Sequence, residues 1–182
     1  MIPKRQQIIE ILPYDPTWPA QFAAEADLIT NIFKKEMVAI HHVGSTSIPN
    51  MPAKPTIDII LVVSDIEQVD QHNASMENLG YEAWGEYRIP GRRFFVKGED
   101  KRTHHVHTFA QGSEHIDRHL YVRDYLIAHP QEAAQYAALK QKVAKQCRHN
   151  RRGYVEGKHD YIVALEQRAI AWWQAQHSSK IQ

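Results

Sequence analysis

One uninterrupted apolar run restricts the folds open to this chain more than any other feature of its sequence. From Ile57 to Val63 every residue is Ile, Leu or Val except Asp58. A strand that is apolar on both sides must be covered on both faces, which predicts a central strand with helices above and below the sheet. The chain has 182 residues, enough to bury such a core without a disulfide or a metal, and we expect a single domain over residues 1–182.

Charge and cysteine content exclude several classes of protein. The 22 Lys and Arg against 21 Asp and Glu give a net charge of +1, which argues against binding nucleic acid or anionic membrane by bulk charge. The one cysteine, Cys147, excludes an internal disulfide and a Cys-rich zinc site. No apolar stretch is long enough to cross a bilayer and residues 1–11 lack the core of a secretory signal, so we expect a soluble, cytoplasmic protein.

The periodicity of the rest of the chain predicts an α+β fold. Ser64 and Glu67 have the spacing of a capping box, and Gly80 is a typical helix end. The predicted elements are a helix from Asp15-Pro16, strands over 37–43 and 56–63, a helix over 66–79, strands over 93–97 and 103–109, and helices from 117 onward with a break at His129-Pro130. We therefore expect a small mixed sheet flanked by helices in residues 10–112, followed by a helical layer in 113–177.

A carboxylate inside the apolar strand requires a compensating partner. Asp58 without one would suffer a large desolvation cost, so a cation, a metal or several N–H donors should lie nearby. Lys54, just before the strand, is one candidate counter-charge. A structural Lys54–Asp58 ion pair and a functional role for both residues are about equally consistent with this pattern.

Two histidines on a later strand could supply a metal site. Strand alternation places His105 and His107 on one face, and neutral imidazole nitrogens bind divalent metals. Asp58 is the natural third ligand if the two strands are neighbours. The alternative is a pair of hydrogen-bonded or solvated histidines, which is the commoner situation.

Two further motifs are of the kind that binds phosphate. Gly44, Ser45 and Thr46 follow a predicted strand, where glycine permits close backbone approach and hydroxyl and N–H groups can meet phosphate oxygens. Gly91-Arg92-Arg93 precedes another strand, and Arg93 is a candidate for neutralising phosphate charge. The alternative, purely structural interpretation is that the first motif is a turn and the second is a pair of exposed arginines.

Several ordered motifs together resemble the signature of the GrpB family. They are Val43-Gly44-Ser45-Thr46-Ser47-Ile48-Pro49, Ala53-Lys54-Pro55, Ile57-Asp58-Ile59, Gly91-Arg92-Arg93-Phe94-Phe95, His105-Val106-His107 and Arg123-Asp124-Tyr125-Leu126, with Tyr136, Leu139-Lys140, Tyr154 and Lys158. The likeness covers nearly the whole chain. It implies a nucleotidyltransferase-like fold, and a related domain occurs fused behind dephospho-CoA kinase in some bacteria.

The resemblance also implies which residues would serve a nucleotidyltransferase. Such enzymes hold triphosphate at Gly-Ser and bind divalent ions with two acids one residue apart on the next strand. Here Gly44-Ser45 and Asp58 match, but Thr56 stands where the first acid is expected. His105 and His107 would fill that gap, and an Asp/His/His set would favour Zn²⁺, Mn²⁺ or Fe²⁺ over Mg²⁺. No organic cofactor is implied.

Two functions follow from these expectations. The first is an enzyme that transfers a nucleotidyl or phosphoryl group to a small acceptor, with Asp58 and Lys54 as catalytic residues. The residues expected to bind phosphate are Gly44, Ser45, Thr46, Lys54, Arg93, Arg123, Tyr154 and Lys158. The alternative is a non-catalytic domain that recognises a nucleotide, a coenzyme-A precursor or another phosphorylated metabolite, alone, with a protein partner or as a homodimer. A nucleic-acid partner is the least favoured.

Overall fold

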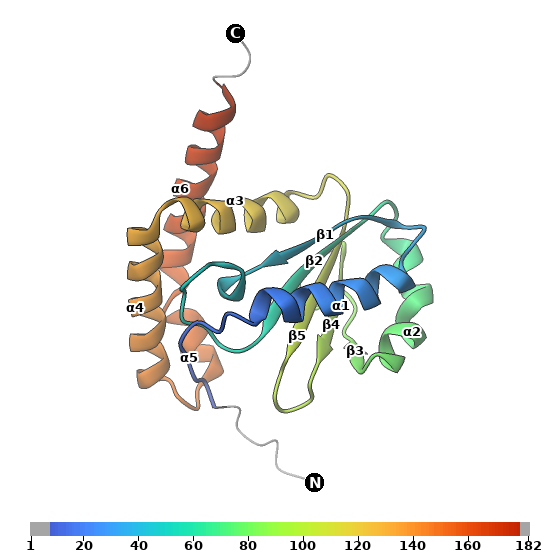
Figure 1. Ribbon diagram of the computed structural model, residues 1–182, viewed down its shortest axis with the longest axis horizontal. Coiled ribbons are helices and arrows are strands. Elements are labelled where there is room, and N and C mark those ends of the chain that lie inside the picture. The colour runs from blue at the N-terminus through green and yellow to red at the C-terminus, as the bar shows by residue number, and fades with distance from the viewer. Residues whose placement is uncertain (1–7, 179–182) are drawn as a thin grey trace.

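The computed structural model describes residues 8–178, which contain a five-stranded mixed sheet of order β1-β2-β5-β4-β3 (Figure 1). The strands are β1 (Met37–Val43), β2 (Ile57–Val63), β3 (Tyr81–Ala83), β4 (Arg92–Lys97) and β5 (His104–Ala110). Strands β2 and β5 run parallel, and the other neighbouring pairs are antiparallel. The predicted α+β class is confirmed.

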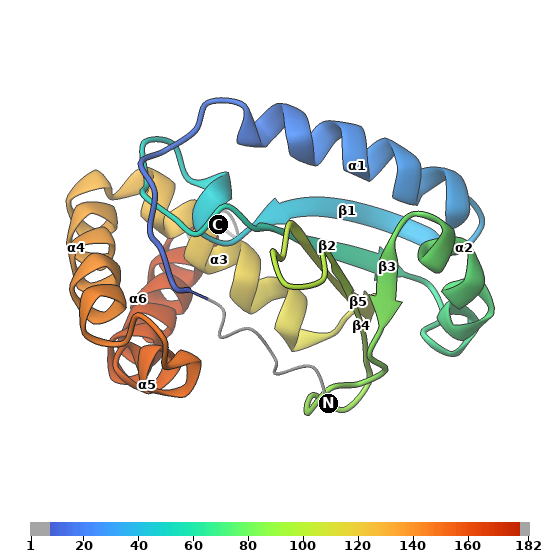
Figure 2. The same ribbon diagram turned by 90° about the horizontal axis from the view of Figure 1, so that it is seen from below.

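Strand β2 is covered on both faces, as its apolar run predicts. On one face Ile57, Ile59 and Leu61 pack with helix α1 (Trp18–Ile32) and with the segment η2–α2. That segment consists of the 3₁₀ helix η2 (Glu67–His72) and the short helix α2 (Asn73–Asn78). On the other face Ile60 and Val62 pack against helix α3 (Glu114–Ala128). Figure 2 shows α1 and α3 on opposite sides of the sheet.

A helical layer closes one end of the sheet. It consists of α4 (Pro130–Gln146), α5 (Arg151–Glu156) and α6 (His159–Ser178), and α6 extends beyond the rest of the molecule (Figure 1). The loop after β1 packs into this layer through Ile48 and Met51. The chain before α1 is held there as well, because Ile9 donates its backbone N–H to the carbonyl of Arg148 at 2.9 Å. Three parts of the chain therefore meet at this end of the sheet: the segment before α1, the loop after β1 and the layer of helices α4 to α6.

Some local predictions were wrong, and the reasons are physical. The predicted capping box is absent, because the backbone N–H of Glu67 donates to Asp65 Oδ1 at 2.9 Å. The helix expected over 66–79 is divided into η2 and α2. Helix α1 begins at Trp18, since Asp15 Oδ1 instead accepts from the N–H of Thr17 at 2.8 Å. Strand β3 and helix α5 were not predicted, because elements this short show almost no periodicity.

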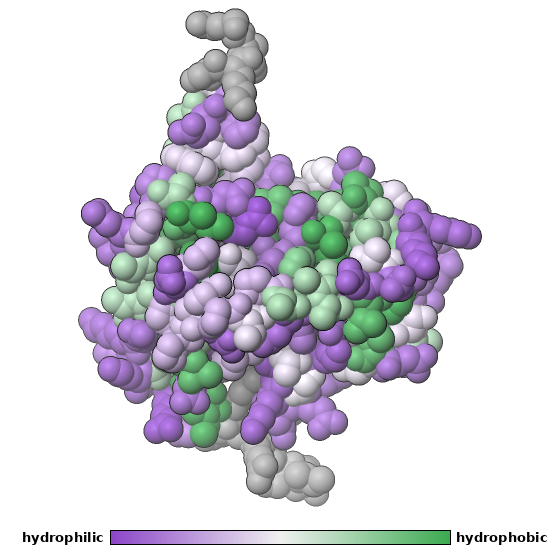
Figure 3. Space-filling model, viewed as in Figure 1, coloured by the Kyte–Doolittle hydropathy of each residue, from purple (hydrophilic) through white to green (hydrophobic). Residues whose placement is uncertain are grey.

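The outer surface mixes polar and apolar residues. On the face shown in Figure 3, hydrophobic residues lie in small groups among hydrophilic ones. Within residues 8–178, no helix has both the length and the apolar character that crossing a membrane requires.

Candidate metal and phosphate site

Asp58 lies beside two histidines because β2 and β5 run parallel with Asp58 opposite His105. His105 Nδ1 is 3.0 Å from Asp58 Oδ1, and His107 Nε2 is 4.0 Å from the same oxygen. One potential ligand atom from each of the three residues lies within 4.8 Å of the others. The structure thus brings together the three side chains that the sequence predicted to converge.

Hydrogen bonding determines the charge state of the Asp58 carboxyl. Burial alone would raise the pKa of Asp58, but the hydrogen bond from His105 and electrostatic interactions with His105, His107 and Lys54 hold it at about 2. The carboxylate is therefore ionised at neutral pH and accepts a hydrogen bond from Nδ1 of His105.

The other histidine is oriented by an arginine. Burial lowers the pKa of His107 to about 3, so its ring is neutral at neutral pH. Arg92 Nη1 lies 3.1 Å from His107 Nδ1, and the guanidinium is anchored to the carbonyls of Glu86 and Tyr87. Since a guanidinium can only donate, Nδ1 accepts and the ring proton sits on Nε2, the nitrogen that faces Asp58.

These three donors fit a divalent cation in kind and in spacing. One carboxylate oxygen and two imidazole nitrogens suit Zn²⁺, Mn²⁺ or Fe²⁺ better than Mg²⁺. An imidazole nitrogen binds metal through its lone pair, so the nitrogen that faces the metal must carry no proton while the other ring nitrogen keeps one. His107 can bind metal through Nε2 only if its ring proton moves from Nε2 to Nδ1. That move requires Arg92 to release its hydrogen bond to Nδ1. Thr56 brings no carboxylate to this group, and its hydroxyl donates to the carbonyl of Arg102 at 3.0 Å.

Gly44 packs directly against the carboxylate. Its φ of +72° lies in the left-handed region, and a Cβ atom at this position would stand 2.6 Å from Asp58 Oδ2. The 3₁₀ helix η1 (Ser45–Ser47) follows immediately. Thr46 is 1% exposed and its hydroxyl lies 2.9 Å from His42 Nε2, so this side chain is not open to a phosphate.

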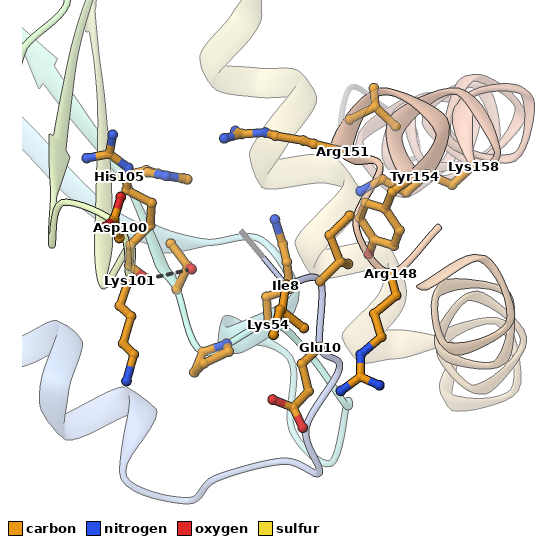
Figure 4. Close-up of a pocket in the computed structure, with 15 residues that line it drawn as sticks. Ile8, Glu10, Lys54, Asp100, Lys101, His105, Arg148, Arg151, Tyr154 and Lys158 are labelled. Atoms are coloured by element: carbon orange, nitrogen blue, oxygen red, sulfur yellow. Dashed lines mark hydrogen bonds between the residues drawn. The ribbon is translucent and has the colours of Figure 1, made fainter. Parts of the chain in front are cut away.

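A basic pocket of about 560 Å³ lies between this end of the sheet and the helical layer. Figure 4 shows His105 on the sheet side, with Arg151, Tyr154 and Lys158 across the cavity and Lys54 pointing into it. The ammonium groups of Lys54 and Lys158 lie 5.7 and 4.6 Å from the centroid of the Tyr154 ring. His105 belongs both to the pocket wall and to the metal-ligand group, so the two candidate sites adjoin.

Sequence reasoning did not select Lys140, although it is part of this region. It lies on α4, is 2% exposed, and donates from Nζ to Ser45 Oγ at 2.7 Å and to the carbonyl of Pro52 at 2.8 Å. Lys140 shares the buried face of α4 with Tyr136, Ala137, Val143 and Ala144. A lysine on an otherwise apolar helical stripe is the signal that could have identified it.

One buried lysine, Lys140, and two half-buried ones, Lys54 and Lys158, lie close enough here for positive charge to lower their pKa values. Burial is the main cause that lowers the pKa of Lys140 to about 7 and of Lys158 to about 8, and the pKa of Lys54 is lowered in the same way. Positive charge on neighbouring basic groups lowers the pKa of each lysine further, while the negative charge of Asp58 raises it. An anion bound among them would relieve this repulsion.

This arrangement predicts an unusual dependence of stability on pH. The pKa values of Lys140 and Lys158 are lower in the folded protein than in the unfolded chain, so the unfolded chain holds more protons between about pH 7 and 10. The free energy of unfolding should therefore rise with pH across this window, and inorganic phosphate should reduce the rise by favouring the charged lysines. Denaturant unfolding at several pH values would measure it. A Lys140→Met/Lys158→Met variant with the same pH slope would contradict this prediction.

Two predicted phosphate-binding arginines lie elsewhere. Arg93 is on the opposite face of β4 from the Asp58 side, where its Nε donates to Asp70 at 2.8 Å. Arg123 donates to the carbonyl of His42 at 3.1 Å and to Asp124. The structure does not bring either one into the pocket wall.

The proposed Lys54–Asp58 ion pair is also absent among residues 8–178. The ammonium group of Lys54 lies by Tyr154, and it lowers the pKa of Asp58 from beyond ion-pair distance. Lys54 is thus available to the pocket.

Comparison with known proteins assigns the chain to a family. A family model described as GrpB protein matches residues 8–168. The chain belongs to the GrpB family. The UPF0157 protein YqkA of Bacillus subtilis (strain 168) is 46% identical over 172 residues, covering 94% of this chain and 50% of that protein. The chain therefore spans about half the length of this relative. The crystal structure of the conserved protein GrpB from Enterococcus faecalis matches with a TM-score of 0.87 at 38% identity, covering 90% of this chain and 99% of that one.

Two more distant similarities extend beyond this GrpB family. A dephospho-CoA kinase of Mycolicibacterium paratuberculosis is 23% identical over 189 residues, covering 90% of this chain and 46% of that protein. A crystal structure of the Cid1 poly(U) polymerase matches with a TM-score of 0.47 at 11% identity, covering 72% of this chain and 40% of that one. A TM-score this low carries no argument about function. The predicted family membership is confirmed by the GrpB matches.

Proposed function

We propose that this GrpB protein is a metal-dependent enzyme that transfers a nucleotidyl or phosphoryl group from a phosphorylated small molecule to a small acceptor. The observation that carries this proposal is the junction of two features at His105, which lines the basic pocket and also lies among the three potential metal ligands. Phosphoryl transfer depends mainly on positioning the phosphate and neutralising its charge, and these two features meet that need.

Each group has a defined part in this proposal. Lys54, Lys158 and Arg151 would bind the phosphate oxygens of the substrate from the walls of the pocket. Asp58, with His105 and His107, would hold the cation, which when bound would neutralise charge on the transferred group. The ring of Tyr154, which is 2% exposed, would help to position the ammonium groups of Lys54 and Lys158 that lie near it. The pocket is large enough for a nucleotide-sized ligand.

A second candidate function is supported by Thr56. The position where working nucleotidyltransferases carry their first acid holds a hydroxyl that is already bonded to the carbonyl of Arg102. A site with one carboxylate suits binding better than two-metal catalysis. The protein would then recognise a nucleotide, a coenzyme-A precursor or another phosphorylated metabolite without transforming it, as an accessory domain.

Thermal melting distinguishes the two functions. If the protein is a metal-dependent enzyme, a nucleoside triphosphate should raise the melting temperature only with Mn²⁺ or Zn²⁺, because a ligand that binds only the folded state stabilises it by about 2.7 kcal/mol at a hundredfold excess over Kd. Asp58→Asn should abolish this shift, because it removes the anionic metal ligand. A shift that is independent of metal would instead support the binding domain.

The control is Asp70→Asn, which removes a carboxylate that pairs with Arg93 on the other face of the sheet. This variant should keep the full metal-dependent shift. The absence of a shift with every phosphate compound and metal would contradict both functions.

A further inference from the structure

Ser45 and Lys140 form a hydrogen-bonded pair at the junction of the sheet and the helical layer. The pair joins residues 95 positions apart in sequence, with 2.7 Å between Lys140 Nζ and Ser45 Oγ. The other partner of the amine is the carbonyl of Pro52, at 2.8 Å. A neutral amine in this position would donate one N–H to that carbonyl and offer its lone pair to the serine hydroxyl. This is the geometry of a base beside a nucleophile.

We propose that Ser45 is a nucleophile activated by Lys140, and that the protein transfers a phosphoryl or nucleotidyl group through a covalent ester on Ser45. The substrate class, a small molecule with a phosphoanhydride or activated phosphate ester, rests on the function proposed above for the basic pocket. The nucleophile itself rests on the pair of side chains alone.

The step balances without a further reagent. Neutral Lys140 takes the hydroxyl proton of Ser45, Oγ forms a bond to the phosphorus atom, and the bond from phosphorus to the leaving oxygen breaks. The leaving group departs as an anion that takes up the proton from Lys140. Water or an acceptor hydroxyl then attacks the same phosphorus, its proton passes to Lys140, and Ser45 Oγ leaves and regains a proton from the lysine. No electron is gained or lost.

The surroundings allow Lys140 to act as a base near neutral pH. Burial lowers its pKa to about 7, and repulsion from Lys158 and Lys54 adds to this effect, while Asp58 opposes it. The ring of Tyr136 lies 4.9 Å from the ammonium group and contributes no formal charge. The charged groups that face Lys140 are therefore two cations and one carboxylate.

Ser45 is also the hydroxyl of its loop that is best placed to react. It is partly exposed, whereas Thr46 is buried against His42. Ser47 donates its hydroxyl to the carbonyl of Gly44 at 2.6 Å and has no base beside it among the residues described. Because Gly44 contacts Asp58, the loop that carries Ser45 starts at the candidate metal site.

A fluorophosphonate probe tests the nucleophile without knowledge of the natural substrate. Such probes form a covalent phosphonyl ester with activated serines, and mass spectrometry of the digested protein locates the adduct. We expect one adduct on Ser45, absent in Ser45→Ala and retained in Ser47→Ala, the matched control. No adduct on Ser45 at any pH between about 6 and 9 would overturn the proposal.

Lys140→Arg separates a base from a structural tether. Arginine keeps the charge and can donate to both partners, but it does not deprotonate. We expect the labelling rate to fall by on the order of 100-fold, as for loss of a general base. An undiminished rate would show that Lys140 only holds the loop and would overturn the proposal.

The pH profile of the unaltered protein gives an independent reading if that variant does not fold. Labelling should rise with pH and level off above about 7, following deprotonation of Lys140. A rate that is flat across this range would overturn the assignment. These measurements need neither metal nor nucleotide, so a failed nucleotide-binding test would refute the proposed function while leaving this result to stand or fall separately.

Discussion

Replacing His105 and His107 together with Ala should lower the affinity for Zn²⁺ or Mn²⁺ by on the order of 100-fold or more. Losing a residue that merely orients a metal ligand already costs about 10- to 100-fold, and this change removes two of the three ligands themselves. The remaining carboxylate of Asp58 would hold a cation only weakly. Isothermal titration of protein without a histidine tag would measure the affinity.

The matched control is His104→Ala. His104 neighbours His105 on the same strand, but alternation directs it to the opposite face of the sheet. We expect its removal to leave metal affinity within about twofold. If untagged protein binds no divalent metal, or if the double variant binds as tightly as the unaltered protein, the metal site is refuted.

Gly44→Ala should have the largest effect on stability. The φ of +72° costs a residue with a Cβ atom roughly 1–2 kcal/mol, and the new atom would stand 2.6 Å from Asp58 Oδ2. Moving the carboxylate away would weaken its bond with His105. We expect a loss of about 3 kcal/mol in the free energy of unfolding together with weaker metal binding, measured by denaturant unfolding and titration.

Gly91→Ala isolates the contribution of backbone conformation. Gly91 has nearly the same φ, +74°, and a Cβ atom there would meet nothing within 4 Å. It should therefore lose only about 1–2 kcal/mol. Equal losses for the two variants would mean that the contact between Gly44 and Asp58 has no role in stability.

The candidate metal site was largely predictable from sequence. A lone carboxylate in an apolar strand needs a partner, and alternation places His105 and His107 on one face of theirs. The parallel pairing of β2 and β5 then puts Asp58 opposite His105. The only tertiary contact that this prediction needs is the pairing of β2 with β5.

The phosphate-binding residues were predicted less well. The motif Gly91-Arg92-Arg93 predicts a phosphate-binding arginine but does not say which one faces Asp58, because a shift of one residue along a strand moves a side chain to the other face. The predicted Arg93 lies on the face away from Asp58. The family resemblance implies a phosphate-binding role for Arg123, but this arginine donates to the carbonyl of His42 instead. The pocket is lined by three of the other predicted residues, Lys54, Tyr154 and Lys158. Their role in binding phosphate stays a prediction.

By itself, the sequence determined which segments are buried and which side chains share a face, because apolar periodicity and strand alternation are local properties of the chain. That was sufficient for β2 and for the pair His105 and His107. Only the tertiary structure decided that Lys140 meets Ser45 and that Arg92 fixes the proton of His107. Those contacts depend on how the helices dock on the sheet and on the strand register. Docking and register are determined jointly by the burial of many residues that are distant in sequence, so no local pattern predicts them.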